Sequence, residues 1–117
     1  MQNQSRALKN KLNLNKCVSF WCKLRGLAWR NSLPDHQGLV FILPSESRAS
    51  ASVHMFGMFF HLAIIWLDTD LKVVDIQKAY AWRSILFPKI KAKYVIECRI
   101  SRISEFKIGD QLALEPK

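Results

Sequence analysis

An apolar run of 15 residues, Val53 to Leu67, constrains the fold of this chain more than any other feature of its sequence. The run contains two histidines and is shorter than the roughly 18–20 apolar residues that a membrane-spanning helix needs, so we interpret it as core. It stops at Asp68-Thr69-Asp70, which are typical turn residues, and Lys72 to Ile76 then alternates in polarity. The sequence therefore predicts an antiparallel hairpin. The side chains expected to share a face are Val73 with Asp75, and Val74 with Ile76.

Short apolar or alternating segments predict the remaining strands. These strands span Leu12–Val18, Gly38–Leu43, Ser50–Met55, Phe59–Leu67 and Tyr94–Cys98. Gly57 permits a bend or bulge, and Ser19 is a suitable N-cap for a short basic amphipathic helix ending near Arg30. Ser101–Phe106 predicts a helical turn, and Gly109-Asp110 predicts a turn.

The connections between these strands are too short for repeated βαβ crossovers. We therefore expect an α+β, mainly β fold, in which antiparallel strands curl into a partly closed barrel with one or two short helices. A chain of 117 residues fits one domain, which we place at residues 12–117 after a flexible basic N-terminus at residues 1–11. The start of the chain lacks the apolar core of a secretion signal, so the expected compartment is the cytoplasm.

The net charge of +9 is concentrated in two stretches, one before Asp35 and one between Arg83 and Lys107. A fold that brings these stretches together would present a positive face. Such a face attracts nucleic acid or anionic lipid, although many basic proteins carry one only for solubility.

Neither metal binding nor catalysis has a motif in this sequence. Cys17, Cys22 and Cys98 do not form a metal-site pattern, and we expect reduced thiols, with a Cys17–Cys22 disulfide as the open alternative. His54 and His61 are seven apart, which places them on opposite faces of an uninterrupted strand. The acidic residues Asp68, Asp70 and Asp75 fit hairpin-turn carboxylates better than a cation loop. The four tryptophans are expected in the core, the alternative being an exposed stacking surface; they are Trp21, Trp29, Trp66 and Trp82.

Several short motifs, taken in order, resemble a known family. These are Arg25-Gly26-Leu27 with Arg30 and Leu33, Gly38-Leu39, Pro44, His54-x-Phe56-Gly57-Met58, Leu67-Asp68, Trp82-Arg83, Glu97 and Gly109-Asp110. The pattern is similar to that of the domain-of-unknown-function family numbered 192, also called uncharacterised protein family 0127. The resemblance covers about Cys17 to Leu114 and implies a fold without an established activity.

The sequence also departs from that family pattern. Where the family usually has Pro-x-Asp, this chain has His61-Leu62-Ala63, so the expected carboxylate is replaced by Ala63. Ser50 occupies a position where related members often carry cysteine, and Cys98-Arg99-Ile100-Ser101 replaces a Leu-Pro-Ala-Gly segment. These differences suggest a specialised or degenerate member.

The sequence therefore favours a non-catalytic binding or accessory module with a cleft near His54. The expected ligand-binding residues are His54, Met58, Arg25 and Asp110. We expect no catalytic residue, metal or cofactor, and the partner would be a small molecule or a protein of unknown identity. Electrostatic binding of nucleic acid through the basic surface is the alternative.

Overall fold

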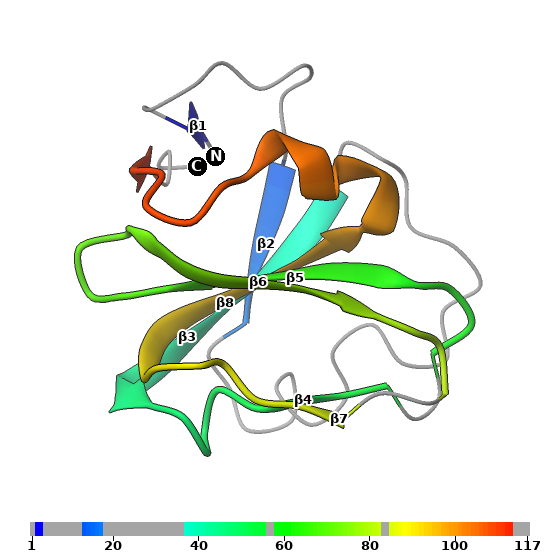
Figure 1. The fold of residues 1–117 in the computed structure, drawn as a ribbon, viewed down its shortest axis with the longest axis horizontal. Coiled ribbons are helices and arrows are strands. Elements are labelled where there is room, and N and C mark those ends of the chain that lie inside the picture. The colour runs from blue at the N-terminus through cyan, green and yellow to red at the C-terminus, as the bar shows by residue number, and fades with distance from the viewer. Residues whose placement is uncertain (1, 4–12, 18–36, 56–57, 83–84, 114–117) are drawn as a thin grey trace.

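A curled five-stranded sheet forms the centre of the molecule in the computed structural model, which describes residues 2–3, 13–17, 37–55, 58–82 and 85–113 (Figure 1). The strand order is β2-β3-β8-β5-β6, and two two-stranded sheets, β1-β9 and β4-β7, flank it. The elements are β1 (Gln2–Asn3), β2 (Asn13–Cys17), β3 (Gln37–Ser47), β4 (Val53–His54), β5 (Leu62–Leu67), β6 (Val73–Ala79), β7 (Ile85–Leu86), β8 (Ala92–Arg99), the 3-10 helix η1 (Ile100–Glu105) and β9 (Leu112–Ala113).

The fold class predicted from the sequence is confirmed. Within the described residues the chain is mainly β, most strand pairs of the central sheet are antiparallel, and η1 is a short helix. The sheet is curled without closing into a barrel. The pair β2–β3 is the exception, because it runs parallel. The predicted helix before Arg30 and the bend at Gly57 lie outside the described residues.

Side chains on the two faces of the central sheet form two separate cores, because successive residues of a strand point to opposite faces. On one face lies the Trp66 cluster, made of Leu39, Phe41, Leu43, Ala51, Val53, Met55, Met58, Leu62, Ile64, Trp66, Ala79, Ala92 and Val95. On the other lies the Phe106 cluster, made of Val40, Ala63, Ile65, Leu67, Val73, Ile96, Cys98, Phe106 and Leu112. In Figure 1 β4 and β7 lie below the sheet and η1 above it, so each face is covered.

The predicted hairpin is confirmed as β5 and β6, but the predicted facing of its second strand is wrong. Trp66 pairs with Asp75 whereas Leu67 pairs with Val73, so β6 has one extra residue at this point. This β-bulge reverses the alternation locally. Val73 and Ile76 consequently pack in the Phe106 cluster, and Val74 packs against the Trp66 cluster.

Other strand boundaries also differ from prediction. β3 continues through Pro44 to Ser47, because the pairing with β8 is interrupted between Ile42 and Ser47 and the missing N–H of Pro44 is not needed there. The strand predicted at Ser50–Met55 is reduced to β4, and β5 begins at Leu62 rather than at Phe59. β8 and η1 lie where the sequence predicted a late strand and a helical turn.

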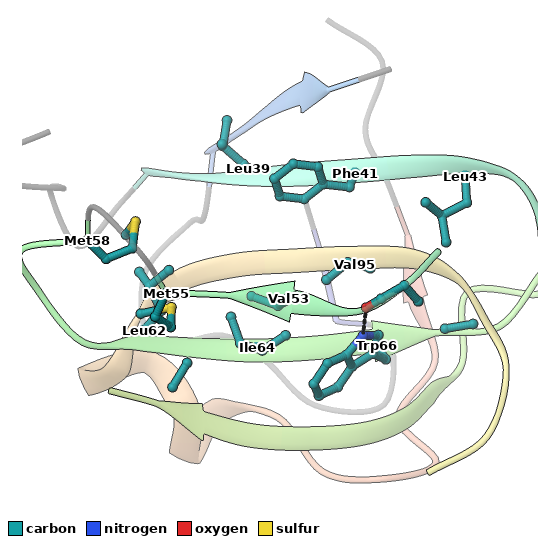
Figure 2. Close-up of a cluster of buried hydrophobic side chains, with 13 residues drawn as sticks. Leu39, Phe41, Leu43, Val53, Met55, Met58, Leu62, Ile64, Trp66 and Val95 are labelled. Atoms are coloured by element: carbon teal, nitrogen blue, oxygen red, sulfur yellow. Dashed lines mark hydrogen bonds between the residues drawn. The ribbon is translucent and has the colours of Figure 1, made fainter. Parts of the chain in front are cut away.

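Trp66 anchors the loop before β4 to the central sheet. Its side chain is fully buried, and its Nε1–H donates a 2.7 Å hydrogen bond to the carbonyl oxygen of Ala51 (Figure 2). A buried indole N–H needs such a partner. Trp66 therefore contributes both apolar volume and a hydrogen bond to the backbone at Ala51.

We expect Trp66→Phe to lower the free energy of unfolding by about 2 kcal/mol, because it removes ring volume and leaves the Ala51 carbonyl without its donor. Chemical denaturation would measure the change. Trp82→Phe is the matched control, since Trp82 is 46% exposed, and it should cost about 0.5 kcal/mol or less. Equal losses in the two variants would contradict the anchoring role.

Candidate functional site

Glu97 places a carboxyl group on β8, the central strand of the five-stranded sheet. It lies on β8, opposite Leu39 of β3 and Ile64 of β5. Both neighbours belong to the Trp66 cluster, whereas the adjacent Ile96 and Cys98 belong to the Phe106 cluster. By strand alternation the Glu97 side chain projects to the face of the Trp66 cluster. A carboxyl group is thus placed among apolar side chains.

Burial determines the chemistry of Glu97. The residue is 7% exposed, and loss of hydration raises the pKa of its carboxyl from 4.5 to about 8. Among the residues that the structure describes, none makes a hydrogen bond or ion pair with this carboxyl. The group therefore holds its proton at neutral pH, and a strongly shifted carboxyl in an apolar setting is a candidate binding group.

Two of the predicted site residues, Met58 and Asp110, lie on opposite sides of the central sheet. Met58 is buried in the Trp66 cluster, and the backbone of His54 pairs with Ile85 on the same side of the sheet. Asp110 lies on the opposite side, next to the strand that carries Val73 of the Phe106 cluster. Arg25 lies outside the described residues. The sheet thus separates Met58 from Asp110, and the structure brings Met58, β4 and Glu97 to one side.

Asp110 forms a turn. Its Oδ2 accepts a hydrogen bond from the backbone N–H of Lys107, and its own N–H donates to the Lys107 carbonyl. Its carbonyl accepts the N–H of Val73, and Gly109, at φ 93°, donates its N–H to the Val73 carbonyl. A positive φ favours glycine. These bonds attach the segment after η1 to the start of β6.

Three of the positions at which the sequence departs from the family pattern are Ala63, His61 and Ser50. Ala63 is fully buried and pairs with Cys98. At this position a methyl group therefore packs in the core where the family pattern has an aspartate carboxylate. The His61 Nδ1 atom accepts the backbone N–H of Ala81 at 2.9 Å, and its ring contacts Tyr80 edge-on. Ser50 is exposed in a turn.

Cys98 is a free, fully buried thiol in the described part of the chain. Burial, partly opposed by the nearby Arg102, raises its pKa to about 12. Reactivity belongs to the thiolate, and burial keeps this cysteine in the thiol form at neutral pH. Arg102 forms a buried ion pair with Glu105 within η1. The possible Cys17–Cys22 disulfide involves a residue outside the described part.

The turn carboxylates are confirmed for Asp68, whose Oδ1 accepts the N–H groups of Asp70 and Lys72. Asp75 differs from this prediction, because it lies within β6 and is 1% exposed. Its Oδ1 accepts the N–H of Ile76 at 2.8 Å. Its Oδ2 accepts the Nε2–H of Gln77 at 2.8 Å and the backbone N–H of Lys89 at 3.0 Å. Asp75 therefore fixes the segment before β8 to the sheet.

Within the described ranges, no group of three or more His, Cys, Asp or Glu residues is placed to hold a metal ion. All four tryptophans are expected in the core from the sequence. Trp66 is buried there, whereas Trp82 is exposed and contacts Phe59 edge-on, with 5.7 Å between the ring centroids. Trp21 and Trp29 lie outside the described part. None of the described helical residues forms a segment long and apolar enough to cross a membrane.

Comparison with known proteins gives consistent matches. The DUF192 family model, which carries the description "Uncharacterized ACR", matches residues 1–114. A UPF0127 protein of Thermococcus kodakarensis is 38% identical over 100 residues, which cover 84% of this chain and 62% of that protein. One from Pyrococcus abyssi is 35% identical over 112 residues, covering 94% and 92% of the two chains. The chain spans 62% of the length of the relatives from Thermococcus kodakarensis and Thermococcus sibiricus.

Two solved structures share the fold. A protein of unknown function from Novosphingobium aromaticivorans matches with a TM-score of 0.73 at 21% identity, over 86% of this chain and 73% of that one. A candidate transcription regulator from Sinorhizobium meliloti matches with a TM-score of 0.83 at 17% identity, over 94% and 86%. Likeness at such low identity concerns the fold alone.

Proposed function

The chain belongs to the DUF192 family, and from that premise we propose that it is a non-catalytic binding module that holds a small amine with an apolar body beside Glu97. The single observation that carries the proposal is the buried Glu97 carboxyl, which has no partner among the described residues. Apolar surroundings with one ionisable group are typical of small-molecule sites. An ammonium group would supply the missing partner.

The surroundings of Glu97 specify the kind of ligand. Leu39 and Ile64 flank the carboxyl across the strands, and Met55 and Met58 belong to the same cluster. Methionine side chains adapt their shape to an apolar ligand. The sequence prediction of a site near His54 and Met58 is retained in this proposal, whereas Asp110 belongs to the opposite face and is not assigned to it.

Binding of an amine should raise the melting temperature of the wild-type protein, and the shift should grow as the pH rises toward the pKa of about 8 for Glu97. The ionised carboxylate is the form that pairs with an ammonium, so amine binding releases the carboxyl proton. Thermal unfolding with n-hexylamine and 2-phenylethylamine measures the effect. At a 100-fold excess over Kd the stabilisation is about 2.7 kcal/mol.

Glu97→Gln should abolish this shift, and Asp70→Asn is the matched control because Asp70 is an exposed carboxylate. His54→Ala should reduce the shift if His54 belongs to the site, and an unchanged shift would remove His54 from it. An equal shift in wild type and Glu97→Gln would refute the assignment of Glu97. The absence of any shift with either amine would refute the ligand class.

Electrostatic nucleic-acid binding is the competing hypothesis. Its support is the excess of exposed cations, because Asp75, Glu97 and Asp110 are buried and Glu105 pairs with Arg102. This hypothesis requires an oligonucleotide affinity that falls steeply with salt. Weak binding at low salt would exclude it.

A further inference from the structure

Residues 85–91 present three large apolar side chains to solvent. Ile85 is 58% exposed, Phe87 50% and Ile90 53%. Between them, Leu86 packs against the Trp66 cluster and Pro88 is buried. Leu86 and Pro88 thus anchor the segment in the core while their neighbours remain outside. Burying the three exposed side chains against a partner would be favourable, so their exposure indicates an interaction site.

The backbone of this segment is held in place by side chains of β6 and by Arg48. Asp75 Oδ2 accepts the Lys89 N–H at 3.0 Å, and Gln77 Nε2–H donates to the Phe87 carbonyl at 2.9 Å. Arg48 Nε–H donates to the Pro88 carbonyl at 3.0 Å. Three consecutive residues are therefore fixed from outside the segment. A loop held in this way can present Phe87 and Ile90 without losing much conformational freedom on binding.

The charge around the apolar side chains is positive. Lys89, Lys91 and Arg48 are exposed, and the sequence contains no acidic residue between Asp75 and Glu97. Those two acidic residues are themselves buried. Lysine side chains can lay their methylene stems along an apolar surface and keep the ammonium group in a polar layer. A partner that is anionic outside and apolar beneath would match this surface.

We propose that residues 85–91, together with Arg48, form a docking surface for anionic lipid bilayers. Phe87, Ile90 and Ile85 enter the boundary between headgroups and acyl chains, and the three cations contact the anionic headgroups. Two of the three exposed apolar residues are isoleucines, which have no flat face on which a nucleotide base stacks. Their exposure favours a hydrocarbon partner over a single-stranded nucleic acid.

Co-sedimentation with vesicles tests this proposal. The full chain should bind vesicles made of equal parts phosphatidylcholine and phosphatidylglycerol, bind pure phosphatidylcholine far more weakly, and lose affinity as salt is added. Replacing Phe87 and Ile90 together by serine should lower the affinity about tenfold or more. Replacing Lys89 and Lys91 together by glutamine should lower it by about the same factor.

Matched controls are available on the opposite side of the sheet. Ile108 is 61% exposed and Lys107 is exposed, and both follow η1. Ile108→Ser and Lys107→Gln should leave vesicle affinity within about twofold of wild type. If the serine double variant does not fold, the lysine double variant still tests the same surface.

Three results would overturn the proposal. The first is failure of the wild-type protein to bind the anionic vesicles at low salt. The second is an equal loss of affinity in the control and loop variants. The third is that the protein does not bind vesicles but binds a single-stranded oligonucleotide, and that the same loop substitutions abolish this binding. That result would assign the surface to nucleic acid.

Discussion

Glu97→Gln is expected to be more stable than the wild-type protein by up to about 5 kcal/mol at about pH 9, above the pKa of about 8 that burial gives this carboxyl. The magnitude follows from the rise of that pKa from 4.5, at about 1.4 kcal/mol for each pKa unit. Since domains of this size are stable by only about 5–15 kcal/mol, the buried charge would remove a large part of the total.

The sign of the effect follows from proton linkage. The folded-state pKa of Glu97 lies above the unfolded-state value, so the folded protein keeps a proton that the unfolded chain has released. The contribution of Glu97 is therefore fully present below about pH 4.5 and is lost as the pH rises to about 8. Wild type and Glu97→Gln should accordingly have similar stability in acid and diverge toward alkaline pH.

Urea denaturation at intervals between about pH 4 and 9, which bracket the two pKa values, would measure this divergence. Asp70→Asn removes a carboxylate from an exposed turn and should run parallel to wild type. Glu97→Met should stabilise the protein over the whole range, because it replaces a buried polar group by an apolar one of similar length. Parallel curves for wild type and Glu97→Gln would show that Glu97 is hydrated or paired in solution.

The hairpin was predictable because its signals are local. Asp68 supplies side-chain acceptors within its own turn, and the apolar run before it is long enough to fill β5. The continuation of β3 through Pro44 was not predictable, because it depends on a gap in the pairing with β8. The bulge in β6 depends likewise on which residues pair across the hairpin. Long-range pairing decides both features, and alternation along one strand does not contain that information.

The candidate site was predictable only in part. Met58 and β4 lie on one side of the sheet and Asp110 lies on the other, and residues far apart in sequence cannot be assigned to one face before the strand order is known. The unusual burial of Glu97 has a local signal in the sequence: it is the one acidic residue of the otherwise mostly apolar Tyr94–Cys98 strand, where it lies between Ile96 and Cys98. A carboxyl in the centre of an apolar strand is either paired or strongly perturbed.

Asp75→Asn is expected to lower the free energy of unfolding by about 3–4 kcal/mol. Asp75 is 1% exposed and accepts three hydrogen bonds, from Ile76, Gln77 and Lys89. An amide in its place offers a single acceptor oxygen, so at least one of these donors would face an NH₂ group. Breaking a buried network by changing one partner costs more than the net value of its bonds, because the remaining groups stay buried without partners.

The site at which Asp75→Asn loosens the structure distinguishes a loss of the Asp75 hydrogen bonds from a general loss of core packing. Hydrogen exchange at the Lys89 amide should accelerate more in Asp75→Asn than exchange in β5, because Lys89 loses its acceptor directly. Gln77→Ala should have a smaller effect, since Asp75 keeps its bond to Lys89 in that variant. If residues 85–91 dock on membranes as a fixed loop, Asp75→Asn should also weaken binding to anionic vesicles while leaving Phe87, Lys89 and Ile90 unchanged. Uniform acceleration of exchange across the sheet would instead assign Asp75 to the stability of the whole core.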